Sequence, residues 1–336
     1  MFENFAVIER ESSFSTKEKD EQFAKDVLQG LKSSTKYLPS KYFYNEKGDL
    51  LFQKIMELEE YYLTKAEYNI LNKYKEKIGS YCQENDKNFN LIELGAGDGM
   101  KTKLLLNHFL ENKMSFSYLP IDISGNALSK LKNELQISVP ELKLHCMQGD
   151  YFACLEKLSH LWTDKNIILF LGSSIGNFNQ QEALEFFIQV HQSMKPHDLL
   201  LTGFDLKKDP RIVLNAYNDK EGVTKDFNLN LLERINKELN ADFDVSTFDH
   251  FPVYDPVSGL AKSYLISNKS QYVHIADLKM NIKFNKSEPI LMEISRKYDI
   301  SSIEKMAHYS GFEIIDNFTD ENNFFVNSLW KHKEMN

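Results

Sequence analysis

The stretch Leu91-Ile-Glu-Leu-Gly-Ala-Gly-Asp-Gly-Met-Lys101 decides how this chain folds. It reads as an apolar strand that enters a glycine-rich turn and then a helix, which we expect over residues 100–110. Glycine accepts positive φ and lets bare backbone approach a ligand, while the start of a helix offers unpaired N–H groups. The stretch therefore predicts a site for a nucleotide-like ligand, although glycine turns after strands also occur for purely structural reasons.

The spacing of the glycines favours one kind of ligand. Gly95, Gly97 and Gly99 form G-x-G-x-G, and Met100 stands where a dinucleotide-binding motif has its last glycine. Together with the acidic Glu93 before the turn, this pattern fits S-adenosylmethionine better than a dinucleotide, because that cationic cofactor has no pyrophosphate to bind. The glycines alone leave dinucleotide binding open.

The segments that follow repeat the strand-then-helix order of an open parallel sheet. Further strands are expected at residues 118–123, 142–147, 166–171 and 199–204. Polar residues or glycine follow at their ends: Asp122, then Asp150 with Tyr151, then Gly172, then Asp205. Ligands of such sheets bind beyond the carboxyl ends of the strands.

These strand ends suggest roles in holding an adenosyl group. Asp122 can accept both hydroxyl protons of a ribose, Asp150 can bind an adenine amino group, and Tyr151 can cover the adenine face. Taken singly, Asp150 and Asp205 are more simply explained as helix caps. The ordered set of strand ends favours the ligand site.

Length and composition predict an intracellular enzyme. The 336 residues exceed one ordinary domain, and 42% hydrophobic content suffices for a sizeable core. A net charge of −9 argues against a nucleic-acid partner. Without an N-terminal signal or a long apolar run, we expect no membrane partner and a cytoplasmic monomer. The three cysteines lack Cys-x-x-Cys spacing, so we expect no metal site.

The strand-helix order breaks after Leu206 and returns near residue 297. Between these points come helical segments (209–218 and 223–239) and then alternating runs expected as antiparallel strands (263–267, 272–284 and 289–298). We expect a cofactor domain from residues 63–206 and 297–336, and a substrate domain from residues 15–62 and 207–296. The substrate pocket should lie between them.

The N-terminal segment is rich in tyrosine and includes Tyr44 and Tyr61. Most tyrosines of a chain are simply core or interface residues. A methyl-transfer site nevertheless has a use for them, since a tyrosine face attracts a sulfonium or ammonium cation and its hydroxyl can hold an amine or a carboxylate.

The sequence resembles the histidine-specific Nα-methyltransferases of ergothioneine biosynthesis, which trimethylate the α-amino group of L-histidine to hercynine. The matching segments span nearly the whole chain: residues 41–48, 58–67, 92–97, 170–177, 203–210, 216–219, 222–228 and 292–298. The resemblance implies an α/β fold, in which a Rossmann-like class I methyltransferase sheet is joined by a second α+β domain. It also implies S-adenosylmethionine as cofactor, with S-adenosylhomocysteine as product.

The resemblance also implies roles for individual residues. The cofactor would contact Gly95, Lys101, Asp122, Asp150 and Tyr151, to which we add Gly172 at the fourth strand end. The substrate would meet Asn177 and Tyr217 at its carboxylate, Tyr44 near its amine, and Tyr61, Glu293 and Ser295 around its imidazole. Tyr44 and Asn177 would align the amine for catalysis.

Glu293 and Ser295 are two residues apart in an expected strand, so both should point to one face. A carboxylate and a hydroxyl side by side suit an imidazole, which has a donor and an acceptor nitrogen. Without the resemblance, Glu293 would be more simply explained as the cross-strand partner of a lysine.

One position departs from the family. Its bacterial members place a methionine beside the imidazole where this chain has Ser263 in the pocket wall, which bears on selectivity for the substrate side chain. Two alternatives stay open: methylation of another amino acid or amine such as tryptophan, and a non-catalytic S-adenosylmethionine-binding protein. Retention of Gly95, Asp122 and Asn177 together speaks against the second.

Overall fold

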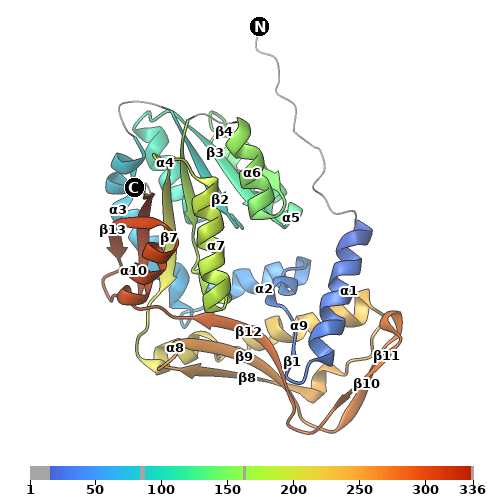
Figure 1. Ribbon diagram of the computed structural model, residues 1–336. Coiled ribbons are helices and arrows are strands. Elements are labelled where there is room, and N and C mark those ends of the chain that lie inside the picture. The colour runs from blue at the N-terminus through green and yellow to red at the C-terminus, as the bar shows by residue number, and fades with distance from the viewer. Residues whose placement is uncertain (1–15, 84–87, 162–163, 334–336) are drawn as a thin grey trace.

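A computed structural model describes residues 16–83, 88–161 and 164–333 (Figure 1). The domain boundaries expected at residues 15 and 336 lie outside these ranges. The largest element is a mixed sheet with the strand order β13-β14-β7-β6-β2-β3-β4, in which β5 also pairs with β3. It contains the glycine-rich stretch at the end of β2.

The centre of this sheet is parallel. It consists of β2 (Phe89–Leu94), β3 (Phe116–Asp122), β6 (Lys165–Phe170) and β7 (Leu199–Asp205), with the short β4 (Lys143–Leu144) and β5 (Met147–Gln148) beside β3. The antiparallel strands β14 (Phe325–His332) and β13 (Phe312–Thr319) complete the other edge. Every residue of β2 and β7 is buried, as expected for strands covered on both faces.

Helices cover both faces of the sheet. One face packs against α3 (Tyr62–Cys82), α4 (Thr102–Glu111) and α5 (Gly125–Ser138). The other packs against α6 (Tyr151–Leu161), α7 (Gln180–Ser193) and α10 (Ile300–Tyr309). The expected α/β, Rossmann-like fold is therefore confirmed.

A second sheet has the order β1-β12-β9-β8 and appears below the first in Figure 1. Its strands are β1 (Lys36–Tyr37), β12 (Pro289–Arg296), β9 (Leu260–Ser267) and β8 (Phe248–Asp255), and a separate hairpin joins β10 (Gln271–Ile275) to β11 (Met280–Phe284). Residues of α1 (Thr16–Lys32), α2 (Glu46–Glu57) and α9 (Val223–Glu238) share its apolar core. The short α8 (Pro210–Ala216) lies against β8.

Three strand expectations need correction. The run 142–147 forms the separate strands β4 and β5, which pair with β3 through only two residues each. The run 272–284 is a hairpin, because Lys279 adopts a left-handed φ of 49° and provides the reversal that glycine usually marks. The strand β8 was not expected from the sequence, because it holds Pro252 and its residues alternate irregularly between exposed and buried.

The two sheets meet where β12 contacts the 3₁₀ segment η2 (Ser174–Asn177), which follows β6. A Cβ atom on Gly176 would lie 3.0 Å from the backbone oxygen of Arg296 and 3.4 Å from Ser295 Oγ. Just after β12, the Tyr298 amide donates to the Asp205 carbonyl oxygen at 2.8 Å. These contacts fix the end of β12 against the carboxyl ends of β6 and β7.

Candidate active site

The glycine turn after β2 has the backbone expected of a ligand site. Gly95, Gly97 and Gly99 adopt φ values of 75°, 54° and 63°, a region that favours glycine. A Cβ atom on Gly95 would lie 2.8 Å from the Tyr151 hydroxyl oxygen. Only glycine therefore fits at position 95 beneath Tyr151. Gly95 and Tyr151, two of the expected cofactor-binding residues, thus lie next to each other.

Asp122, at the end of β3, lies beside the same turn. Its Oδ2 accepts from the Gly97 amide at 3.0 Å, and its Oδ1 accepts from the Ser124 amide at 2.8 Å. Burial raises the pKa of Asp122, although these amide hydrogen bonds oppose the shift. Each carboxylate oxygen keeps a further acceptor position, so Asp122 can still bind a pair of hydroxyl groups.

Asp150 is a helix cap, as its simpler explanation predicts. Its Oδ1 accepts from the amides of Phe152 and Ala153 at 3.0 and 3.2 Å, at the start of α6. The residue is exposed. A contact with adenine stays a prediction for Asp150.

Lys101 connects the turn after β2 with the turn after β6. Its ammonium pairs with Glu67 Oε2, which also accepts from the Gly172 amide at 2.8 Å. The other Glu67 oxygen accepts from Asn327 Nδ2 at 3.0 Å. Glu67 was not among the expected site residues, although it ends the matching segment 58–67. This buried carboxylate holds Lys101 and Gly172 in place.

Asp205 is not a cap, so that explanation is wrong. It is fully buried at the end of β7 and pairs with two lysines: Lys208 at Oδ1, and Lys297 at Oδ2 with a distance of 2.7 Å. The Tyr62 hydroxyl reaches both of its oxygens at 2.9 and 2.8 Å. Asp205 is therefore the centre of a buried ion cluster.

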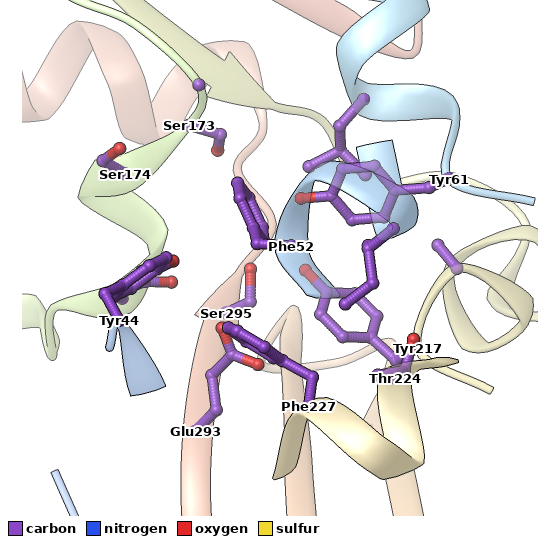
Figure 2. Close-up of a pocket in the computed structure, with 15 residues that line it drawn as sticks. Tyr44, Phe52, Tyr61, Ser173, Ser174, Tyr217, Thr224, Phe227, Glu293 and Ser295 are labelled. Atoms are coloured by element: carbon purple, nitrogen blue, oxygen red, sulfur yellow. The ribbon is translucent and has the colours of Figure 1, made fainter. Parts of the chain in front are cut away.

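A pocket lies where the two sheets meet (Figure 2). Seven expected site residues line it: Tyr44, Tyr61, Gly172, Asn177, Tyr217, Glu293 and Ser295. Eight further residues complete its wall: Phe52, Ile55, Leu63, Ser173, Ser174, Ala216, Thr224 and Phe227. Figure 2 shows the oxygens of Tyr61, Tyr217, Glu293 and Ser295 turned towards a common space. The pocket therefore joins α2, α3, α8, α9 and β12 to the segment that follows β6.

Aromatic rings form one side of this pocket. Phe52 lies 5.6 Å from Tyr44, 6.3 Å from Tyr61 and 5.8 Å from Phe227, measured between ring centroids. Phe227 belongs to the matching segment 222–228, so the sequence carried a signal for it. For Phe52, the sequence offered no signal other than its place on the apolar face of a helix.

Tyr44 lines the pocket but keeps 39% of its surface exposed. Desolvation inside the pocket raises the pKa of its hydroxyl, and the charges of Glu293 and Asp122 add to the shift. The hydroxyl therefore keeps its proton at neutral pH and can donate a hydrogen bond.

Glu293 points into a poorly solvated part of the pocket. Burial raises its pKa to about 7, while the ammonium of Lys297 opposes the shift. Ser263 lies opposite Glu293 in the β9–β12 ladder and is only 1% exposed. Its side chain therefore lies on the same face of the sheet as Glu293, but it is not among the residues that line the pocket, where we had expected it. Within the described part of the chain, its Oγ has no hydrogen-bond partner.

Comparison with known proteins identifies the family. A model of S-adenosylmethionine-dependent, histidine-specific methyltransferases matches residues 23–332. The chain belongs to this family. It is therefore a methyltransferase that uses S-adenosylmethionine, and the pocket where the two sheets meet is its candidate active site.

Several relatives are similar over most of this methyltransferase. A histidine N-alpha-methyltransferase of Mycobacterium tuberculosis (strain CDC 1551 / Oshkosh) is 32% identical over 91% of this chain and 93% of that protein. Ergothioneine biosynthesis protein 1 of Schizosaccharomyces pombe is 30% identical over 84% of this chain and 37% of that protein. An L-tryptophan methyltransferase of Psilocybe serbica is 26% identical, with 88% of each chain covered. In the described residues of this methyltransferase, no helix is both long and apolar enough to cross a membrane.

Proposed function

We propose that this methyltransferase transfers three methyl groups in succession to the α-amino group of L-histidine and forms hercynine, a step of ergothioneine biosynthesis. The relatives named for histidine methylation and ergothioneine biosynthesis support this substrate. One observation carries the proposal: Glu293 and Ser295 line the same pocket as Asn177 and Tyr217. The carboxylate and hydroxyl that can bind an imidazole thus share a pocket with the polar side chains that can bind the α-carboxylate and α-amino group of an amino acid.

The proposed roles follow from the chemistry of each side chain. Glu293 accepts a ring N–H, and Ser295 binds the second ring nitrogen. Tyr217 and the amide of Asn177 hold the substrate carboxylate without acting as a base. Tyr61 closes the pocket around the ring.

The glycine turn fits the cofactor, since its bare backbone leaves room that a side chain would fill. We propose that Gly95, Lys101, Asp122 and Tyr151 hold S-adenosylmethionine, with Asp150 and Gly172 at the rim. When bound, this cofactor supplies an electrophilic methyl group for direct displacement by the amine. The proposed cofactor residues all fall in the cofactor domain that we expect from the sequence, whereas the proposed substrate residues come from both expected domains, since Asn177 belongs to residues 63–206.

The residues around the amine act by positioning it. The α-amino group of a peptide has a pKa of about 7.7–8.0, and the neighbouring carboxylate of a free amino acid raises this pKa, so only a small part of the substrate amine is neutral at pH 7. The amine reacts after losing its proton to water. Tyr44 and Asn177 align its lone pair, and holding two reactants in line supplies much of a rate enhancement. The faces of the surrounding aromatic rings tolerate the growing ammonium charge. One proton must leave before the second and the third transfer, through water or a tyrosine.

Mass spectrometry of products tests the substrate. The purified protein is incubated with S-adenosylmethionine and each amino acid separately. We expect a gain of three methyl groups on histidine alone. A product with tryptophan but none with histidine would reverse the proposal in favour of the tryptophan alternative, which the inward-facing Glu293 and Ser295 argue against.

Substitutions next to the amine test the positioning roles. We expect Tyr44→Phe and Asn177→Ala each to lower kcat/KM for histidine by roughly 10- to 100-fold, because each removes a hydrogen bond that orients the reacting group. Tyr42→Phe is a matched control, since the Tyr42 hydroxyl binds Asp26 at 2.7 Å, away from the pocket lining. Steady-state kinetics measure the three variants. If Tyr44→Phe and Asn177→Ala both leave kcat/KM unchanged, the assignment is wrong.

The cytoplasmic location and the monomeric state stay predictions from the sequence. The pocket that supports the proposal takes a small molecule, which agrees with an amino-acid substrate.

A further inference from the structure

Lys297 is a fully buried lysine beneath the pocket floor, one residue after the end of β12. Its Nζ donates to Tyr217 Oη at 2.8 Å and to Ser295 Oγ at 2.9 Å. The third contact of Nζ is Asp205 Oδ2, at 2.7 Å. One ammonium group thus touches two pocket hydroxyls and one buried carboxylate.

The numbers of donors and acceptors in these groups determine which group donates in each hydrogen bond. A lysine ammonium has three N–H donors and no acceptor, and here each donor has one partner. Tyr217 Oη and Ser295 Oγ must both act as acceptors towards Lys297. Each hydroxyl then has its own proton left, which it can donate to the other hydroxyl or to a molecule in the pocket.

We infer that Lys297 is a specificity-determining positioning residue, which turns the hydroxyls of Tyr217 and Ser295 into hydrogen-bond donors towards the substrate. This inference rests on the proposed function and deepens it. The pocket then offers donors at Tyr217 and Ser295 and an acceptor at Glu293. The Tyr217 hydroxyl can then donate to the substrate carboxylate. A ring with one acceptor nitrogen and one N–H can bind between Ser295 and Glu293.

This pattern selects a neutral imidazole among amino-acid side chains. A neutral imidazole has one acceptor nitrogen and one donor nitrogen, whereas indole has a donor alone. An indole N–H could satisfy Glu293 but would leave the Ser295 hydroxyl without an acceptor. Sites built to hydrogen-bond a substrate group discriminate strongly against analogues that lack it, because a buried polar group stays unpaired.

Lys208 supplies a matched comparison within the same cluster. It pairs with the same carboxylate, Asp205, and is also buried, but its other polar partners are the Tyr62 hydroxyl and the Leu206 carbonyl. Neither of these residues lines the pocket. Lys208→Met therefore disturbs the charge balance of the cluster without removing a donor from the pocket hydroxyls.

The experiment compares Lys297→Met, Ser295→Ala and their double variant with Lys208→Met. Steady-state kinetics with histidine give kcat and KM, and titration with S-adenosylmethionine checks that each protein is folded. We expect Lys297→Met to raise KM for histidine by roughly 10- to 100-fold, with a smaller change in kcat. Ser295→Ala already removes one hydroxyl that Lys297 orients, so the double variant should lose less than the product of the two single effects.

Lys297→Gln guards against failure of the methionine variant to fold. Its amide keeps two N–H donors without a charge, so we expect it to restore part of the affinity for histidine. If the rise in KM of the double variant equals the product of the rises in Lys297→Met and Ser295→Ala, the role of Lys297 is overturned. An equal rise in KM with Lys208→Met would overturn it as well, since that result indicates a general effect of the ion cluster.

The outcome for the wild-type protein separates the two proposals. If it does not methylate histidine, the proposed function fails and the role of Lys297 fails with it. If it methylates histidine but the variants behave independently, only the role of Lys297 fails.

Discussion

Replacing Glu293 by glutamine is expected to lower kcat/KM for histidine by roughly 10- to 100-fold, the effect of losing a charge-assisted hydrogen bond. The carboxylate is the acceptor that we assign to a ring N–H, and glutamine offers a weaker, uncharged acceptor. Because burial raises the Glu293 pKa to about 7, the wild-type kcat/KM should also fall as pH drops through 7. In Glu293→Gln the part of this fall that belongs to the carboxyl group should be absent, and only the fall caused by protonation of the free imidazole, with an ordinary pKa of about 6.5, should remain.

The same substitution is expected to stabilise the unliganded protein at pH 8. The folded-state pKa of Glu293 lies above its ordinary value of 4.5, so folding disfavours the charged form. The wild type is unaffected below pH 4.5, loses stability as pH rises to 7, and carries the full penalty above it. Glutamine avoids this penalty, so the gain at pH 8 should be about 1–3 kcal/mol and should vanish near pH 4. Urea unfolding at several pH values measures it.

Glu288→Gln is a control of opposite sign just before the same strand. Burial tends to raise the pKa of Glu288, but hydrogen bonds from the Asn285 amide and Lys36 lower it below its ordinary value. Its ionised form therefore stabilises the fold above pH 4.5, and this contribution is lost as pH falls further. Glu288→Gln should thus lose stability at pH 8 and keep its activity. If Glu293→Gln is also less stable at pH 8, Glu293 is not a strained, desolvated carboxylate.

The sequence predicted the main sheet because its signals are local. The strand-helix order from β2 to β7 follows from apolar runs that end in glycine or acidic residues, and the central strands β2, β6 and β7 are buried on both faces. The second sheet was harder to predict. Its β8 holds Pro252 and lacks a regular alternation of buried and exposed residues, and β10 and β11 resemble one continuous run because a lysine in the left-handed conformation makes the turn.

The sequence predicted those site residues whose side chains can bind the substrate directly. Glu293 and Ser295 were assigned to one face from their spacing, and both line the pocket. The supporting residues could not be found in this way. Glu67, Asp205 and Lys297 each have at least one partner more than 30 residues away in the chain, and only the folded sheet brings these partners together.

Asp205→Asn is expected to destabilise the protein by about 3–5 kcal/mol, the loss typical of removing one partner from a buried ion cluster. The carboxylate is fully buried and is the shared partner of Lys208 and Lys297. With asparagine, two buried ammonium groups face a neutral amide. Chemical unfolding at pH 7.5 measures the loss.

Asp150→Asn is the matched control, because it tests the alternative that both aspartates are helix caps. Asparagine caps a helix about as well as aspartate, so this change should alter stability by only a few tenths of a kcal/mol. A similarly small effect of Asp205→Asn would contradict the ion cluster.

The pH dependence gives a second check on the cluster. Burial lowers the pKa of Lys208, and the charge of Asp205 opposes that shift in the wild type. Without this charge the pKa of Lys208 should fall further, so the variant can lose the buried proton at a lower pH than the wild type. A lysine with a depressed folded-state pKa destabilises the protein below that pKa and is relieved as pH rises towards 10.5. The stability difference between the wild type and Asp205→Asn should therefore narrow between pH 7.5 and pH 9.5, whereas a cap would show no such trend.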